Sequence, residues 1–262
     1  MDVGAGTGLF LGSIHDKFPD YEYHAIEPSR AKTQLRNLDF IKHIHEDFLG
    51  HTSLDVGVFD YITAWFVLEH VDNPLEFMKK IKSLLSSDGR AFLSVPNLLD
   101  DRSDIITLDH ISKFTPKSFR NLCRVAGFEV VAEKLSSVSM YLSLKPTASS
   151  SYEIDRFDPA PIVQANQAYV NRIGEHVNVL LSKKDIAVFG YGKLLPMILH
   201  AGLSISCIID DNSLYKGLNY QSIPVSSFDE FRNGPVLDIL VNVNELSYLR
   251  ILPRLDGYTV YS

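Results

Sequence analysis

The sequence contains few cysteines, no run of basic residues and no long apolar stretch. Its 262 residues include only Cys123 and Cys207 and no Cys-x-x-Cys pair, so we expect neither a zinc module nor a disulfide framework. The net charge of -7 argues against nucleic acid as a substrate. No apolar stretch reaches about 18 residues, so no membrane span is predicted, and no basic segment followed by an apolar run marks a signal peptide. A cytoplasmic location is the default expectation.

The chain begins with a glycine-rich turn, Met1-Asp2-Val3-Gly4-Ala5-Gly6-Thr7-Gly8. It predicts the end of a buried strand, then a tight turn, then a helix from about Gly8. Glycine lets a backbone approach a ligand because no Cβ intervenes, and the free N–H groups of the next helix point toward that ligand. The turn lacks the Gly-Lys-Ser/Thr of a phosphate loop, and Leu9 replaces the third glycine of a dinucleotide site. Asp2 at its mouth would suit a cationic ligand such as an aminoacyl sulfonium.

An acid ends the second predicted strand, which covers Tyr21 to Glu27. Glu27 lies about 20 residues past the glycines, where the ribose-binding carboxylate of a βαβ unit belongs. A third strand is predicted over Phe40 to His45. His43 and His45 share one face of it, and we interpret them as an exposed sheet edge rather than a metal pair, because no third ligand lies nearby in the sequence.

The glycine turn and four later segments resemble, in order, the motifs of class I S-adenosylmethionine (SAM) methyltransferases. The segments are Asp2 to Gly8, Glu27, Glu46-Asp47-Phe48, Phe59 to Val71, and Leu84 to Leu93. The resemblance implies SAM as the cofactor, with Glu27 on the ribose hydroxyls and Asp47 at the adenine amino group. Members of this family normally carry residues before this motif that complete the first strand, so three alternatives stay open: a misplaced start, a fragment, or a protein that does without them. The expected cofactor-binding residues are Asp2, Gly4, Ala5, Gly6, Gly8, Glu27, Pro28, Asp47, Phe48, Trp65 and Glu69.

The order of predicted helices and strands indicates an α/β fold with two domains. Residues 1–145 are expected to form an N-terminally truncated, Rossmann-like methyltransferase domain around a mostly parallel sheet. The segment Lys145 to Ser151 breaks the pattern, and Ala160 to Leu181 is a long helix candidate, so we assign 146–182 as linker and helix. A second, smaller Rossmann-like α/β domain is expected over 183–262.

The best general base in the sequence is His110, in the segment between Pro96 and Thr115. That segment follows the fifth predicted strand, and ligands of open α/β sheets bind outside the carboxyl ends of the strands. An imidazole titrates near neutrality, and the adjacent Asp109 would orient it or raise its basicity. Methyl transfer then requires alignment and removal of a proton from a hydroxyl or a carbon acid. The alternative is that His110 caps or pins the following helix.

The segment Asp109 to Thr115 resembles sugar C-methyltransferases, which carry an acid-His-x-Ser-x-Phe pattern there. The resemblance implies a small-molecule substrate, with His110 as the base over a sugar ring and a second domain that helps enclose a nucleotide sugar. Two departures are an absent N-terminal zinc module and Thr107 where the subfamily has Tyr. O-methylation of a sugar or of a non-sugar metabolite therefore stays open. So does a non-catalytic scaffold or partner subunit that has lost cofactor binding.

Two further features receive weaker assignments. Glu69-His70 ends the fourth predicted strand and is interpreted as lining the cofactor pocket. A second glycine turn, Gly190-Tyr191-Gly192, has Leu195 in place of the glycine of a dinucleotide site, so bound NAD is not expected. Lys193 and the following helix would instead meet a phosphate of an activated sugar. The alternative is that this domain only packs and forms a homodimer.

Overall fold

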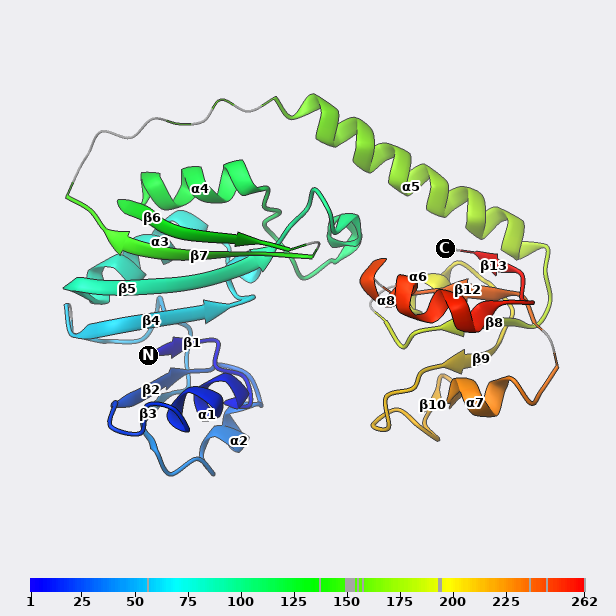
Figure 1. Ribbon diagram of the computed structural model, residues 1–262, viewed down its shortest axis with the longest axis horizontal. Coiled ribbons are helices and arrows are strands. Elements are labelled where there is room, and N and C mark those ends of the chain that lie inside the picture. The colour runs from blue at the N-terminus through cyan, green and yellow to red at the C-terminus, as the bar shows by residue number, and fades with distance from the viewer. Residues whose placement is uncertain are drawn as a thin grey trace. The chain divides into compact units, whose positions relative to one another are not determined.

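The chain folds into two compact units. The computed structural model describes residues 1–55, 57–136, 138–148, 154, 156, 158–192, 195–235, 237–243 and 245–261. The first unit comprises Met1–Asp104 with Leu108–Asp158, and the second comprises Ile105–Thr107 with Pro159–Ser262 (Figure 1). Within the described ranges, no helix has the length and apolar character needed to cross a membrane.

The first unit is built on a seven-stranded sheet with the order β3-β2-β1-β4-β5-β7-β6. From β1 to β5 every adjacent pair is parallel, whereas β7 runs antiparallel to both β5 and β6. The mostly parallel, Rossmann-like sheet predicted from the sequence is confirmed. Its strands are β1 (Asp2–Val3), β2 (Tyr23–Ile26), β3 (Ile41–His45), β4 (Phe59–Trp65), β5 (Leu85–Pro96), β6 (Phe128–Leu135) and β7 (Ser139–Pro146).

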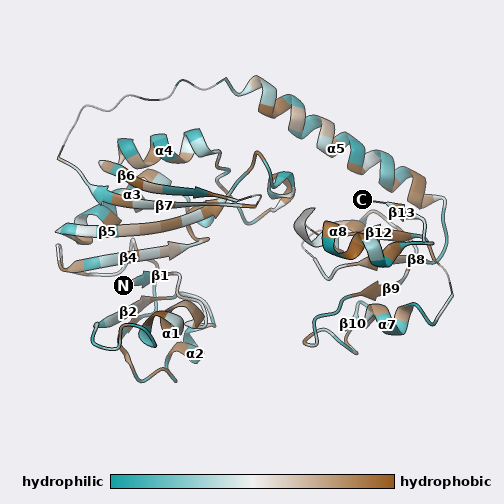
Figure 2. Ribbon diagram, in the orientation of Figure 1, coloured by the Kyte–Doolittle hydropathy of each residue, from teal (hydrophilic) through white to brown (hydrophobic). Residues whose placement is uncertain are grey.

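Helices cover both faces of this sheet, because each face carries its own apolar cluster. Residues of α3 and α4 pack with the larger cluster, and residues of α1 and α2 pack with the smaller one. The strands between them carry both hydrophobic and hydrophilic residues (Figure 2). The helical segments are α1 (Leu9–His15), α2 (Lys32–Leu35), α3 (Pro74–Leu84) and α4 (Pro116–Val125), with short 3-10 turns η1 (Leu68–His70) and η2 (Arg102–Ile106).

Local sequence signals fix where these helices begin. Asn73 caps α3 by accepting a hydrogen bond from the Glu76 backbone N–H at 3.2 Å, and a proline follows at the first helical position. Thr115 and Ser118 form a reciprocal capping box at the start of α4. Both caps are built from residues that are neighbours in the chain.

The second unit repeats the α/β architecture around a six-stranded sheet with the order β10-β11-β9-β8-β12-β13. Apart from the antiparallel pair β10–β11, its strand pairs are parallel. The sequence pattern did not reveal β10, β11, α7 and α8. The elements are α5 (Ala160–Leu181), β8 (Ile186–Phe189), α6 (Leu195–His200), β9 (Ile205–Ile209), β10 (Asn219–Tyr220), β11 (Ile223–Ser226), α7 (Phe228–Phe231), β12 (Ile239–Val241), α8 (Glu245–Ile251), η3 (Leu252–Leu255) and β13 (Val260–Tyr261).

Candidate functional site

The candidate site lies at the carboxyl edge of the parallel strands in the first unit. The chain runs outward from β1 to β3 and then returns to β4, so the strand order reverses beside β1. Ligands of open α/β sheets bind at such a reversal, outside the carboxyl ends of the strands. Five of the segments that the sequence analysis selected follow these strands. They are the glycine turn after β1, Glu27 after β2, Asp47 after β3, Glu69 after β4, and the loop with His110 after β5.

The glycines of the turn after β1 serve two different purposes. Gly4, Gly6 and Gly8 have φ angles of 71°, 55° and 83°, a left-handed region in which other residues are strained. A Cβ on Gly4 would lie 2.4 Å from Val67 Cγ2, and one on Gly8 would lie 2.4 Å from Leu38 Cδ1. A Cβ on Gly6 would meet no atom within 4 Å. Gly4 and Gly8 therefore permit close packing, whereas Gly6 borders open space that a ligand can occupy.

Glu27 holds the turn in place. Its side chain is buried, its Oε2 accepts a hydrogen bond from the Gly6 backbone N–H at 2.7 Å, and its Oε1 accepts one from the Ser29 N–H at 2.8 Å. Pro28, between the two contacts, is half-buried. A carboxylate offers about four acceptor positions, so Glu27 keeps capacity for ligand hydroxyls beyond these two bonds.

Asp2 is not at the mouth of the turn, as the sequence analysis expected. Its side chain is only 2% exposed, and its Oδ1 accepts a hydrogen bond from Thr63 Oγ1 at 2.5 Å. Asp2 lies on β1, between β2 and β4, so the neighbouring strands shield it from water. This burial raises the pKa of the Asp2 carboxyl to about 7, against the opposing effect of the Thr63 hydrogen bond. Direct attraction of a cationic ligand by an exposed Asp2 is therefore excluded.

The residues expected near an adenine lie at the same edge but are more open. Asp47 is exposed, and the hydrogen bond that its Oδ1 accepts from the Phe48 backbone N–H at 2.7 Å lowers its pKa. The Phe48 ring is 62% exposed, which leaves it free to stack on a planar ligand. At the end of β4, Trp65 packs edge-on against Phe10 of α1, with ring centroids 5.0 Å apart.

Glu69, His70 and His110 meet after β4 and β5. Glu69 is fully buried, and its backbone carbonyl accepts a hydrogen bond from the Ser112 N–H at 3.0 Å. The rings of His70 and His110 are perpendicular, with centroids 4.7 Å apart. Donor atoms of the three side chains lie within 4.8 Å of one another, a spacing that a shared cation would also accept. The loop after β5 is thus tied to the end of β4.

The backbone just before this cluster is strained. Phe66, directly after β4, has a φ of 56°, which is rare for a bulky residue. Its N–H donates hydrogen bonds to the Ser94 carbonyl at 3.1 Å and to Ser94 Oγ at 3.2 Å. Strain of this kind collects at functional sites, where the surrounding structure maintains it. No sequence pattern marked Phe66, because its backbone angle follows from the turn out of the sheet.

The structure assigns a different acid to His110 than the sequence analysis did. His110 Nδ1 is hydrogen bonded to Oδ1 of Asp104, whose side chain is 1% exposed. The Asp109 side chain is 76% exposed, and its Oδ2 lies 3.7 Å from His70 Nδ1, which also contacts the Asp109 carbonyl oxygen at 2.8 Å. Although Asp109 is adjacent to His110 in the sequence, its side chain lies beside His70. The turn of η2 brings the Asp104 side chain to the His110 ring instead. His110 does not cap α4, since Thr115 does so.

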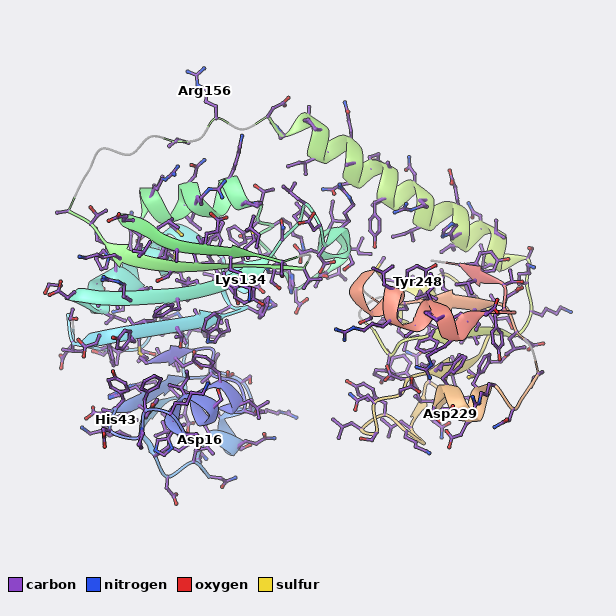
Figure 3. All side chains as sticks on the ribbon, viewed as in Figure 1. Asp16, His43, Lys134, Arg156, Asp229 and Tyr248 are labelled. Atoms are coloured by element: carbon purple, nitrogen blue, oxygen red, sulfur yellow. The ribbon has the colours of Figure 1, made fainter. Side chains whose placement is uncertain are left out.

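Asp104 had no distinguishing signal in the sequence. It is the third acid within the five residues 100–104, and only the turn of η2 separates it from the other two. The histidines of β3 stay apart from the cluster just described. β3 is an edge strand, as the sequence analysis predicted, and His43, labelled in Figure 3, is exposed on it, whereas His45 is half-buried.

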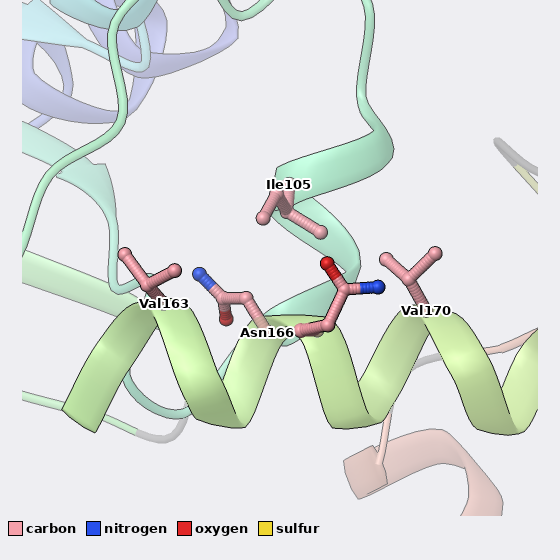
Figure 4. Close-up of a pocket in the computed structure, with 5 residues that line it drawn as sticks. Ile105, Val163, Asn166 and Val170 are labelled. Atoms are coloured by element: carbon pink, nitrogen blue, oxygen red, sulfur yellow. The ribbon is translucent and has the colours of Figure 1, made fainter. Parts of the chain in front are cut away.

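The glycine turn of the second unit has a packing explanation. A Cβ on Gly190 or Gly192 would lie 2.5 Å from the carbonyl oxygen of Asn242, which follows β12. Asp210 after β9 accepts backbone hydrogen bonds from Tyr191 and Asn212, both at 2.8 Å. Lys193, the expected phosphate contact, lies outside the described residues. A pocket elsewhere in this unit is lined by aliphatic and amide side chains, namely Ile105, Val163, Asn166, Gln167 and Val170 (Figure 4).

Curated proteins similar to this chain are ubiquinone biosynthesis O-methyltransferases. The protein from Glaesserella parasuis is 32% identical over 132 residues, which cover 46% of this chain and 56% of the relative. The protein from Neisseria meningitidis serogroup C is 24% identical over 155 residues, which cover 51% of this chain and 65% of the relative. The chain thus spans less than two thirds of the length of either relative.

Solved structures of methyltransferases are also similar. The plantazolicin methyltransferase BpumL, in complex with a pentazolic desmethylPZN analog and SAH, gives a TM-score of 0.49 at 15% identity, covering 56% of this chain and 75% of its own. A SAM-dependent methyltransferase from Thermotoga maritima gives 0.46 at 16% identity, covering 55% and 79%.

A family comparison identifies the domain that forms the first part of the chain. The sequence model of the methyltransferase domain matches residues 1–133, which run from the start of the chain into β6 and include the glycine turn, Glu27, Glu69 and His110. This match covers just over half of the 262 residues, and the chain therefore belongs to the methyltransferase domain family.

Proposed function

We propose that the chain is a SAM-dependent O-methyltransferase that acts on a hydroxyl group of a small molecule. The observation that carries this proposal is the open glycine turn. Gly6 borders free space at the carboxyl edge of the sheet, and Glu27 fixes its N–H. The loop that presents His110 follows β5, whose carboxyl end lies at the same edge. A cofactor site and a base on one sheet edge are the arrangement that methyl transfer requires.

The residues of the turn fit the adenosyl cofactor. A Cβ on Gly6 would project into the open space beside the turn. The left-handed φ of Gly6 also makes any residue other than glycine unfavourable at this position. Glu27 retains acceptor capacity for ribose hydroxyls, and exposed Phe48 offers a flat face for a purine. When bound, SAM supplies a methyl group on a positively charged sulfur, which is a good leaving group.

The chain's own contribution to the reaction is positioning and proton removal. A hydroxyl oxygen is a poor nucleophile until its proton leaves, so a base within hydrogen-bond reach accelerates the transfer. His110 Nδ1 is hydrogen bonded to Asp104, and the atom that we propose takes the proton is Nε2. The acceptor oxygen would then bond to the transferred methyl carbon as its proton passes to His110, while the methyl–sulfur bond breaks and the sulfur leaves as a neutral thioether. The mostly buried ring limits competing water, because the His110 side chain is only 9% exposed.

We favour an oxygen atom as the methyl acceptor. The resemblance of the segment Asp109 to Thr115 to sugar C-methyltransferases suggests a sugar carbon instead. The curated relatives named above are O-methyltransferases of ubiquinone biosynthesis, and none of the names given for them refers to a sugar. The same names agree with the alternative, O-methylation of a non-sugar metabolite, which we adopt. The remaining alternative is a non-catalytic scaffold that has lost cofactor binding, and the titration described next distinguishes it from an enzyme.

The first experiment is calorimetric titration of the folded chain with SAM and with its demethylated product. Micromolar binding corresponds to roughly -8 kcal/mol and would support the cofactor site. Transfer of a tritiated methyl group to pyrocatechol, glycerol or UDP-glucose then separates oxygen acceptors of different classes. A cooperatively folded chain that binds neither cofactor form would refute the enzyme proposal.

The role of His110 is tested with His110→Gln. We expect turnover to fall by about 10²- to 10⁴-fold, the usual contribution of a general base, while SAM affinity stays within about threefold. Unchanged turnover removes His110 from the mechanism. Turnover that is lost after dialysis against EDTA and restored by Mg²⁺ or Zn²⁺ would assign the Glu69–His70–His110 cluster to a cation instead.

A further inference from the structure

We propose that Asp104 is the positioning residue of His110: it holds the imidazole in the tautomer that carries hydrogen on Nδ1, so that Nε2 is the basic atom. This inference rests on the proposed function for its catalytic meaning. Its structural content, the tautomer of one ring, can be tested without any turnover. Neither the family match nor the motifs of the sequence analysis indicate this residue.

The contact between the two side chains is shielded from water. Asp104 is 1% exposed and His110 is 9% exposed at their side chains, and Asp104 Oδ1 meets His110 Nδ1 within hydrogen-bond distance. The other oxygen of the carboxylate, Oδ2, is buried and accepts no hydrogen bond from the described residues. Burying a carboxylate that is only partly paired is costly, so stability alone gives little reason for this acid.

The backbone of Asp104 is fixed from both sides of the loop. Its N–H donates to the carbonyl of Asp101, the residue before η2, at 3.1 Å. Its own carbonyl accepts a hydrogen bond from Lys113 Nζ at 2.5 Å, and Lys113 lies three residues after His110. These two hydrogen bonds hold the Asp104 backbone close to the His110 ring. Pairing of the two side chains therefore costs less conformational entropy.

A carboxylate specifies a tautomer because an ionised one can only accept hydrogen bonds. Nδ1 must then carry the hydrogen, and the lone pair of the neutral ring lies on Nε2. An amide in the same position could donate its own hydrogen to Nδ1, and the ring would then hold its proton on Nε2. This difference separates an acid that positions the ring from a polar residue that only fills space.

Other charged groups also lie near the ring. Glu69 and His70 approach from η1, with donor atoms within 4.8 Å of one on His110. Lys113 contacts the Asp104 backbone, and the exposed Asp109 carboxylate lies beside His70. The structure places the Asp104 carboxylate on Nδ1.

The tautomer is measured directly by ¹⁵N NMR of histidine-labelled protein, at a pH where the ring is neutral. The chain has nine histidines, so the His110 signals are identified by their loss in His110→Gln. We expect an N–H signal for Nδ1 and a bare nitrogen for Nε2 in the wild type. In Asp104→Asn we expect a shift toward hydrogen on Nε2. A wild-type ring with its hydrogen on Nε2 would overturn the proposal, even if the variant does not fold.

Kinetics supply the second readout once a methyl acceptor is found. In Asp104→Asn we expect kcat to fall on the order of 10²-fold, with KM for SAM within about threefold. Asp104→Glu, which restores the carboxylate, should recover part of the loss. A purely structural role would instead raise KM and lower the melting temperature in both variants.

Asp109→Asn tests the rival acid, since it makes the same chemical change five residues away. The proposal requires a smaller loss of kcat in Asp109→Asn than in Asp104→Asn, and the reverse order refutes it. If the wild-type chain transfers no methyl group at all, the proposed function fails, and the NMR measurement still decides the role of Asp104.

Discussion

The substitution Gly6→Ala tests whether the open space beside Gly6 in the glycine turn binds the cofactor. Gly6 has a φ of 55°, and a Cβ built on it meets no atom within 4 Å. The added methyl group therefore costs only backbone strain, about 1–2 kcal/mol for a residue with a Cβ in the left-handed region. The same methyl group enters the space assigned to the cofactor. We expect SAM affinity to fall at least tenfold, which corresponds to about 1.4 kcal/mol of binding free energy.

Gly57→Ala is a matched control in the same unit. Gly57 has a φ of 70°, and its nearest atom would be the Leu85 carbonyl oxygen at 3.9 Å, an ordinary contact. Gly57 precedes β4 and so lies toward the amino edge of the sheet, away from the candidate site. The variant should lose similar stability, about 1–2 kcal/mol, and keep SAM affinity within about twofold.

The assay combines two measurements on each variant. Trp65 is the only tryptophan in the chain and lies on β4, so its fluorescence during denaturant unfolding reports on the first unit. Calorimetry gives SAM affinity under native conditions. Equal stability losses with unequal affinities would support the cofactor site at Gly6. Wild-type affinity in Gly6→Ala, or an equal loss in Gly57→Ala, would refute the reasoning.

Two other changes test the stability of the first unit. Because burial raises the pKa of Asp2 to about 7 from 3.8, the folded chain binds this proton more tightly than the unfolded chain, and wild-type stability should fall as pH rises from about 4 to 7. Asp2→Asn should remove that slope, up to about 1.4 kcal/mol per pH unit, and a pH-independent difference between the two proteins would contradict the assignment. Thr115→Ala should cost about 1–2 kcal/mol by removing the α4 cap, whereas exposed Lys117→Ala should change stability by less than about 0.5 kcal/mol. Equal losses in the two variants, measured by denaturant unfolding, would show that the cap contributes nothing.

The sequence predicted most of the first sheet because its signals are local. The glycines of the first turn and the cap at Asn73-Pro74 each act over a few residues. The turn expected at Asp88-Gly89 is absent, because both residues lie within β5. β7 lies between β5 and β6 because of pairing between strands that are distant in the sequence, so no local pattern predicts its position. In the second unit, β10 is only two residues long, too short for hydrophobic alternation to be recognised.

The sequence by itself determined the class of fold, the glycine turn, the acid Glu27 after the second strand, and His110 as the candidate base. These follow from residue type and spacing along the chain. Only the tertiary structure placed Asp104 on His110, buried Asp2 between two strands, and distinguished Gly6 from its neighbouring glycines. Each of these depends on contacts between residues that are distant in sequence, or on the path of a loop, and burial and hydrogen-bond geometry arise only when the parallel strands bring their carboxyl ends together.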